Sequence, residues 1–222
     1  MNLKMQNIHL GADNIDEAVR SSVGALNAGG VVLYPTDTLY GLGADALSDS
    51  AVDKIYSIKG REEDKPIHAI VADMAMAEKY AVINDFARKL SNRFSPGPLT
   101  LILKKQKGLQ SGITRKLDTI GVRIPNNSFC TALAREFGGP ITATSANKSG
   151  LPPPRSVDKI LEQLGRKASL IDLIIDAGEL PLGAPSTVVD VARVRPIVLR
   201  EGAIAAADIW DELDLSKSAL VT

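Results

Sequence analysis

The chain has 222 residues, of which 45% are hydrophobic and 23% charged, so it can bury a full core and lacks the composition of a disordered protein. Its 26 basic residues balance 26 acidic ones, so the net charge gives no reason to expect general nucleic-acid binding. A net charge of zero is still compatible with a local basic cavity. The single cysteine, Cys130, excludes an intramolecular disulfide, and its apolar neighbours indicate a buried thiol rather than a nucleophile. Because no apolar run has the length of a signal peptide or a membrane span, we expect a soluble cytoplasmic protein.

Helical and strand patterns alternate through the first half of the chain. Apolar residues at helical spacing, stopped by Gly29-Gly30, predict the first helix, and Asn84 is expected to cap a later one. Short apolar runs predict the strands between them. The predicted elements are a helix at 13–28, a strand at 31–34, a helix at 50–58, a strand at 67–71, a helix at 84–94 and a strand at 99–103.

The second half continues the alternation and then changes. Its predicted elements are a strand at 119–124, a helix at 128–137, a strand at 141–144, a helix at 157–164, strands at 173–175, 187–191 and 197–199, and a helix at 205–213 in which Trp210 packs inward. Strands that alternate with helices indicate the α/β class, and the consecutive final strands indicate some antiparallel pairing. With no internal repeat and no linker, we expect one domain over 1–222, with a core at about 12–204 and a C-terminal helix and tail at 205–222.

Several common catalytic motifs are absent from the sequence. It has no phosphate loop of the G-x-x-x-x-G-K-[ST] type, no H-E-x-x-H zinc motif and no G-x-S-x-G nucleophile motif. Of its two histidines, His9 and His68, the second lies in an apolar run and is expected to be an edge or core residue rather than a ligand. Any phosphate site must therefore be built from side chains and irregular loops.

Pro35-Thr-Asp-Thr38 follows a predicted buried strand. Proline favours a turn, and the hydroxyl and carboxylate side chains after it either cap turn amides or face a ligand. Tyr40-Gly-Leu-Gly43 follows directly, and paired glycines allow the backbone to approach a ligand closely. The motif therefore fits either a plain turn or one edge of a binding site.

Two pairs of polar residues are spaced two apart. Lys59 and Arg61 would point to the same side of an extended segment and suit a polyphosphate, or they would only place charge at a helix C-terminus. Ser145 and Asn147 follow a predicted strand, at the sheet edge where open α/β folds bind ligands. Their alternative role is a helix N-cap or an Asx turn.

Two arginines occur in apolar, strand-like runs. Arg123 ends the run Gly121-Val-Arg-Ile-Pro125, and Arg200 lies in Leu199-Arg-Glu-Gly202. A charge in such a strand needs a partner or a solvent-filled cavity. Both are therefore candidates for a binding site.

Taken in order, these motifs resemble those of the YrdC family from about residue 12 to residue 204. The resemblance is carried by Pro-Thr-Asp-Thr-x-Tyr-Gly-Leu, Lys-x-Arg, Ser-Pro-Gly-Pro-Leu-Thr, Gly-Val-Arg-Ile-Pro, Ser-Ala-Asn-x-Ser-Gly, Ser-Thr-Val-Val-Asp and Leu-Arg-x-Gly-Ala-Ile. It implies a twisted open mixed α/β sheet with flanking helices around a concave basic cavity. It also implies L-threonylcarbamoyladenylate synthase activity, a nucleotidyl transfer from L-threonine, bicarbonate and ATP. The product would feed t6A formation in tRNA by downstream enzymes.

The resemblance also implies residue roles. It places ATP contacts at Lys59, Arg61, Lys65, Thr119, Asn147, Arg155 and Arg200, and threonine contacts at Thr38, Arg123, Ser145 and Ser186. Within these sets, the family's catalytic group corresponds to Lys59, Arg61, Ser145 and Asn147. Mg²⁺ is expected to bind through the ATP phosphates, and no metal site on the protein is expected. In longer homologues a histidine contacts substrate where this chain has Ile70, so that contact is expected to be absent or replaced.

Two other functions fit parts of the pattern. An RNA-binding module would use the same concave surface, but neutral charge and few aromatic residues, 4%, count against it. A carbamoyl-transfer unit like that of hydrogenase maturation proteins would need zinc-finger cysteines that this chain lacks. The oligomeric state and the loop that closes over substrate are not predicted.

Overall fold

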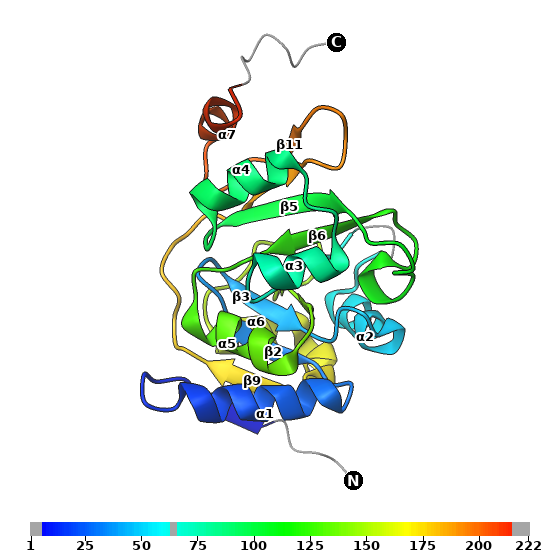
Figure 1. Ribbon diagram of the computed structural model, residues 1–222. Helices are drawn as coiled ribbons and strands as arrows, with labels where there is room; N and C mark the ends of the chain where they lie inside the picture. Colours follow the sequence, from blue (N-terminus) through cyan, green and yellow to red (C-terminus); the bar gives the residue numbers. More distant parts are fainter. Residues whose placement is uncertain (1–5, 63–65, 215–222) are drawn as a thin grey trace.

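A computed structural model describes residues 6–62 and 66–214, and its strands form two mixed sheets with helices packed around them (Figure 1). Sheet A has five strands in the order β1 (Gln6–His9), β9 (Leu173–Asp176), β2 (Val32–Pro35), β3 (Tyr40–Gly43) and β8 (Thr144–Ser145). Sheet B has six strands in the order β11 (Ile197–Arg200), β10 (Thr187–Asp190), β5 (Leu99–Lys104), β6 (Thr119–Arg123), β4 (Ala69–Ile70) and β7 (Ile141–Thr142). The α/β class and the mixed pairing are confirmed, with the strands shared between two sheets.

The expected strand at 141–144 is wrong in one respect, because the chain changes sheets within it. β7 pairs antiparallel with β4 in sheet B, whereas β8 pairs antiparallel with β3 in sheet A. Ala143, at the crossing, donates its N–H to the carbonyl of His68 at 2.8 Å. A single apolar run thus forms a connection between the two sheets.

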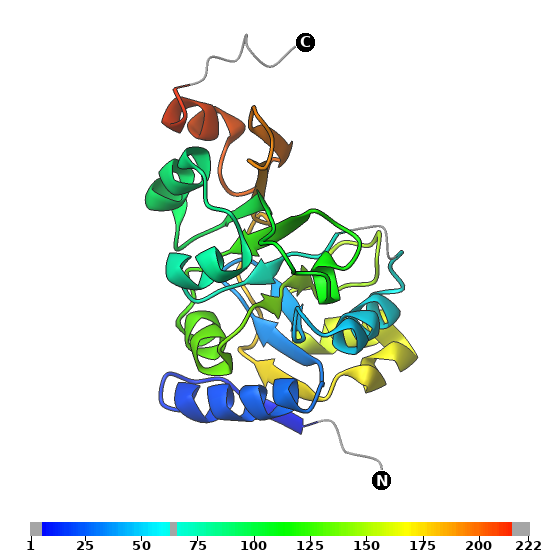
Figure 2. The ribbon, with the colours of Figure 1, turned by 45° about the vertical axis from the view of Figure 1, so that its right-hand side comes forward.

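Seven α-helices and two short 3-10 helices occur in the described ranges. The helices are α1 (Ile15–Asn27), α2 (Asp49–Lys59), α3 (Met74–Tyr80), α4 (Asp85–Phe94), α5 (Ser128–Phe137), α6 (Val157–Leu164) and α7 (Ala206–Glu212), with 3-10 turns at Gly112–Thr114 and Gly165–Leu170. Figures 1 and 2 show α3, α4 and α5 on one side of the strands and α2 and α6 on the other. No helix in this part of the chain is long and apolar enough to cross a membrane.

Local capping explains where several helices begin and end. Asn84 accepts the N–H of Ala87 at 2.9 Å at the start of α4, as its sequence position predicts. Asn127 accepts the N–H of Cys130 at 3.0 Å at the start of α5. Gly138, with a φ of 76°, ends that helix in the left-handed conformation that glycine adopts most easily.

The expected anchoring roles of two side chains are confirmed. Trp210 is buried on α7, which packs against α4. Cys130 is fully buried on α5, where its thiol donates to the carbonyl of Pro35 at 3.3 Å. Burial raises the pKa of this thiol well above its usual range, so it stays protonated and inert.

The Tyr40-Gly-Leu-Gly43 motif forms strand β3, and two of its residues, Tyr40 and Gly41, line a cavity. Its glycines leave room for the fully buried ring of Tyr34 on the neighbouring strand. A Cβ on Gly43 would lie 2.6 Å from Cε1 of that ring. The Tyr34 hydroxyl then reaches across to sheet B and donates to the carbonyl of Thr142 at 3.0 Å. The glycines therefore serve a contact between the sheets.

We predict that Gly43→Ala lowers the free energy of unfolding by about 1–3 kcal/mol, because the new methyl group overpacks Tyr34 and the side chain of Ile141. Gly24→Ala is the matched control, since Gly24 is exposed in α1 with no atom within 4 Å of the added carbon. That control should raise stability by up to about 1 kcal/mol through helix propensity. Urea denaturation measures both, and a Gly43→Ala protein as stable as the wild type would contradict the packing argument.

Candidate functional site

A cavity of about 430 Å³ lies between the two sheets. Its volume is in the range of small-molecule sites in proteins. Arg61, Arg123 and Arg200 are the cations that line it, and Asp190 is the only acid among the described lining residues. Its hydroxyl-bearing lining residues are Thr36, Thr38, Tyr40, Thr100, Thr119, Thr144, Ser145 and Ser186. The walls therefore favour an anionic ligand with several oxygen atoms.

Arg123 lies at the end of β6 and is held in a fixed orientation. Its Nε donates to the carbonyl of Gly97 at 3.1 Å, Nη1 to the Thr38 hydroxyl at 2.9 Å and Nη2 to the Asp37 carboxylate at 2.6 Å. The side chain is only 5% exposed, so these contacts replace most of its hydration. A guanidinium has five N–H groups. The N–H groups that these three bonds do not use can point to a ligand carboxylate.

The turn after β2 combines both roles that its sequence allows. The Thr36 hydroxyl donates to the carbonyl of Leu39 at 2.7 Å and accepts the N–H groups of Thr38 and Leu39 at 3.1 Å, which closes the turn. Asp37 and Thr38 instead hold the Arg123 guanidinium. Thr38 lines the cavity beside it.

Arg200 and Ser186 form a second polar group on the wall from sheet B. Nη2 of Arg200 donates to the carbonyl of Ser186 at 2.8 Å and to its hydroxyl at 3.1 Å. That hydroxyl also shares a hydrogen bond of 2.8 Å with Thr100. Burial and the charge of Arg123 lower the pKa of Arg200, because both arginines face the same cavity and repel each other.

Lys59, at the end of α2, is buried and points at the loop that follows β8. Its ammonium donates to the Ser145 carbonyl, to the Asn147 carbonyl at 3.0 Å and to Asn147 Oδ1 at 3.1 Å. The Ser145 hydroxyl donates to the same Oδ1 at 2.5 Å. Burial, followed by the charge of Arg61, lowers the pKa of Lys59 to about 7.

Of the two readings of Lys59 and Arg61, the extended segment is wrong, and the position at a helix C-terminus is confirmed. Gly60 has a φ of 57° and turns the chain at the end of α2, so the two side chains diverge. Arg61 lines the cavity and donates to the carbonyl of Pro66 at 2.9 Å. Lys59 supports the loop of Ser145 from behind, and neither Lys59 nor Asn147 lines the cavity.

The remaining candidates separate into three cases. Thr119 lines the cavity on β6. Arg155 does not line it and pairs with Glu179 at 2.5 Å. Lys65 lies outside the described residues.

His68 is the lining residue that the sequence interpretation missed. It precedes β4 and lines the cavity, whereas Ile70 is fully buried and does not. Burial and the charges of Arg123, Arg200, Arg61 and Lys59 lower the pKa of His68 to about 3, so its imidazole is neutral. The apolar run around His68 suggests a core position. Only the four cations that act on the imidazole in the folded protein distinguish His68 from a core residue.

The model of the Sua5/YciO/YrdC family, described as telomere recombination, matches residues 24–202. A Methanocaldococcus jannaschii protein named putative threonylcarbamoyl-AMP synthase is 42% identical over 79% of this chain and 81% of its own length. A Pyrococcus abyssi protein named threonylcarbamoyl-AMP synthase is 40% identical over 86% of this chain, which spans only 56% of that longer relative.

The fold agrees with a solved structure. The crystal structure of Pyrococcus abyssi Sua5 complexed with L-threonine has a TM-score of 0.84 and 36% identity, over 95% of this chain and 61% of the Sua5 chain. Sequence and fold therefore lead to one conclusion: the chain belongs to the Sua5/YciO/YrdC family.

Proposed function

We propose that this protein is an L-threonylcarbamoyladenylate synthase, a nucleotidyltransferase that forms threonylcarbamoyl-AMP and pyrophosphate from L-threonine, bicarbonate and ATP. The observation that carries the proposal is the convergence of Arg61, Arg123 and Arg200 on one cavity, from three segments far apart in the sequence. The names of relatives at about 40% identity support the same reaction. The product would pass to the enzymes that form t6A in tRNA.

The end of the cavity near Arg123 suits the amino acid. The guanidinium, already oriented by Asp37 and Thr38, would pair with the threonine carboxylate. Ser186 and Thr38 would offer hydroxyls to the polar groups of the same substrate. The structure of a relative complexed with L-threonine supports a threonine site in this fold.

The wall that carries Arg61 and Thr119 suits the nucleotide. Arg61 and Arg200 would offset the triphosphate charge. The Ser145 hydroxyl, which donates to Asn147 Oδ1, would accept a hydrogen bond from the L-threonine held beside the nucleotide. Lys59 and Asn147 would act from behind by holding the backbone of the Ser145 loop. We assign them positioning roles.

The residues present fit Mg²⁺ that arrives with ATP. Among the described residues, no cluster of three or more His, Cys, Asp or Glu side chains forms a metal cage, and Asp190 is the only acid on the described wall. Phosphate oxygens and water are the ligands that Mg²⁺ prefers in nucleotide sites. When bound, the ion would neutralise charge that develops on the leaving pyrophosphate.

The chemistry needs positioning rather than a protein nucleophile. The threonine amine loses a proton and bonds to the carbon derived from bicarbonate, releasing water and leaving a carbamate. A carbamate oxygen then bonds to the α-phosphorus, and the bond to pyrophosphate breaks. Cationic side chains that hold both substrates in one cavity supply proximity and charge neutralisation for these steps.

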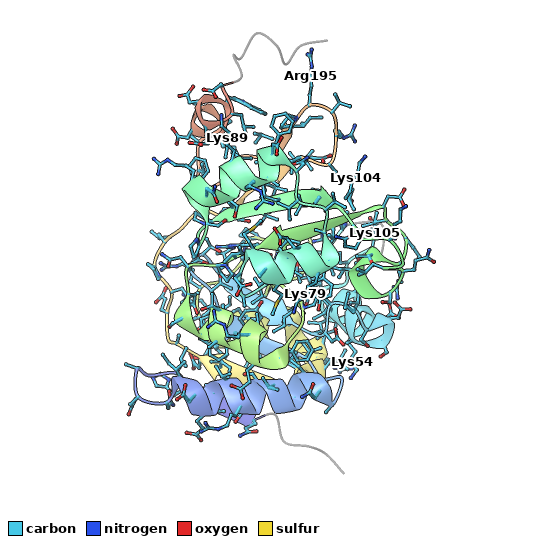
Figure 3. The ribbon with its side chains drawn as sticks, in the orientation of Figure 1. Lys54, Lys79, Lys89, Lys104, Lys105 and Arg195 are labelled. Carbon is cyan, nitrogen blue, oxygen red and sulfur yellow. The ribbon has the colours of Figure 1, made fainter. Side chains whose placement is uncertain are left out.

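The RNA-binding alternative is not favoured. Figure 3 shows labelled basic side chains spread over different elements of the surface: Lys54, Lys79, Lys89, Lys104, Lys105 and Arg195. Lys54 donates to Gly29, Lys89 pairs with Asp214 and Lys105 donates to Thr114, so these side chains are engaged within the protein. Tight, salt-sensitive retention of RNA in a filter-binding titration, without ATP turnover, would favour that alternative.

We predict that pyrophosphate release requires ATP, L-threonine, bicarbonate and Mg²⁺ together, because the amine and the carbon source build the nucleophile. Omitting any one component should reduce release to background in a coupled pyrophosphate assay. Mass spectrometry of the mixture should show the threonylcarbamoyl adenylate. Release that persists without threonine or bicarbonate would refute the synthase reaction.

We predict that Arg61→Ala lowers kcat/KM for ATP by about 100-fold or more, because it removes a cation from the phosphate wall. The matched control is Arg88→Ala, since Arg88 is exposed on α4, pairs with Glu78 and does not line the cavity. The control should retain activity within about twofold. Wild-type rates in the Arg61 variant would show that Arg61 only places a charge at the end of α2 and does not bind ATP.

We predict that the free energy of unfolding rises by about 1–2 kcal/mol between about pH 7 and pH 8.5 through Lys59. The folded pKa of Lys59 is about 7 and the ordinary value is 10.5, so in this window the unfolded chain binds the extra proton and stability rises with pH. Urea titrations of Lys59→Met should lose this rise, whereas Lys54→Met should keep it. Equal slopes in all three proteins would contradict the assignment.

A further inference from the structure

The backbone around His68 fixes where its imidazole can point. The carbonyl of His68 accepts the N–H of Ala143 at 2.8 Å, which ties it to the crossing between the sheets. On the other side, a Cβ on Gly121 would lie only 2.8 Å from the His68 Cβ. The absence of a side chain on Gly121 thus lets β6 lie directly against His68, and the ring lines the cavity.

The ring of His68 makes no hydrogen bond within the described ranges, 6–62 and 66–214. Other polar groups of the wall are engaged: Asp190 accepts from Arg193 at 2.9 Å, and the Tyr40 hydroxyl donates to Gly178 at 2.8 Å. The pKa of Tyr40 is raised to about 12, mainly by burial, so it cannot accept a proton as a phenolate at neutral pH. The imidazole is the lining group that is both basic in type and open to a ligand.

Positive charge acts on the imidazole from three parts of the chain. Lys59 and Arg61 come from the end of α2, Arg123 from β6 and Arg200 from β11. The cations keep the free imidazole neutral, so it has a lone pair available.

The acidic groups near this cation cluster are fewer. Asp190 lines the same cavity, and Asp37 lies behind Arg123, paired with it at 2.6 Å. Filling the cavity with a triphosphate and a carboxylate would offset the cations that lower the pKa of His68 and raise its affinity for a proton. Substrate binding would thus make the imidazole of His68 basic enough to accept a proton.

We propose that His68 is a catalytic residue that accepts the proton which the amino group of L-threonine must lose before it becomes a carbamate. The inference rests on the proposed function. One ammonium N–H bond breaks and its proton bonds to a ring nitrogen. The freed electron pair then bonds to the bicarbonate carbon, the C–OH bond of bicarbonate breaks, and the hydroxide leaves as water with the second proton of the amine. The proton later leaves His68 to solvent, so the imidazole is regenerated.

The test compares His68→Gln and His68→Asn with His9→Gln, a control at an exposed position on β1. Both substitutions at His68 keep a hydrogen-bonding amide and remove the titrating ring. We expect kcat to fall by about 10²–10⁴-fold, the usual contribution of a general base, with KM for ATP and for threonine changed less than about threefold. The control should keep the wild-type kcat.

The dependence of kcat on pH distinguishes a proton acceptor from a structural residue. Wild-type kcat should fall on the acid side with an apparent pKa near 6–7, the usual range of histidine. In both His68 variants that limb should disappear, and the rate should keep rising to about pH 9 as solvent deprotonates the amine. An unchanged pH profile, or a kcat within about threefold of wild type, would overturn the inference.

Binding and stability measurements complete the test. Equilibrium binding of ATP and the urea midpoint should match the wild type within error, and loss of ATP binding in parallel with kcat would overturn the catalytic role. If wild-type protein itself fails to release pyrophosphate in response to threonine, the proposed function fails first. A working wild type with fully active variants would refute only the role of His68.

Discussion

Thr142 ties the two sheets together through its backbone and its side chain. Its N–H donates to the Ala44 carbonyl, and its hydroxyl accepts from the Ala44 N–H and donates to the Leu42 carbonyl, each at 2.9 Å. Its own carbonyl accepts the Tyr34 hydroxyl at 3.0 Å. These bonds are buried, where leaving a polar group unpaired costs about 1–3 kcal/mol. Because the cavity has walls from both sheets, its geometry depends on this junction.

The cavity concentrates positive charge, and the fold stabilises each cation separately. Arg123 is held by Asp37, Arg200 by the carbonyl of Ser186, and Lys59 by carbonyls of the loop that follows β8. Only the first of these partners is a full negative charge, so the group retains an excess of positive potential when no ligand is bound. That excess reduces stability in the free protein and is offset by an anionic substrate, which is the usual relation between strain and function at a binding site.

The local signals in the sequence predict helices better than they predict the site. The helices at Ser128–Phe137 and Val157–Leu164 have the expected bounds, because capping residues and apolar spacing act within a few turns. The expectation of one strand at 141–144 is wrong, since sheet membership depends on distant partners. The motif at Tyr40–Gly43 lies on the cavity wall as one of its readings predicts, but its second role, leaving space for Tyr34, also depends on distant partners. The sequence indicates Arg123 as a site residue because a charge in an apolar strand needs a partner. It does not identify that partner, Asp37, which lies far away along the chain.

The positive charge that favours anions in the cavity also lowers the proton affinity of basic groups there. Three arginines line the cavity and Lys59 lies behind its wall, and together they disfavour any further positive charge in it, whether on the imidazole of His68 or on the ammonium group of an amino acid. Once phosphate and carboxylate groups enter, they offset the cations, and the imidazole regains the basicity that it needs to accept a proton from an amine held beside it. A cationic cavity is therefore suited both to holding a triphosphate and to preparing an amine for attack. This connection makes His68, whose ring has no hydrogen-bond partner among the described residues, the group to examine for chemistry, rather than the buried thiol of Cys130.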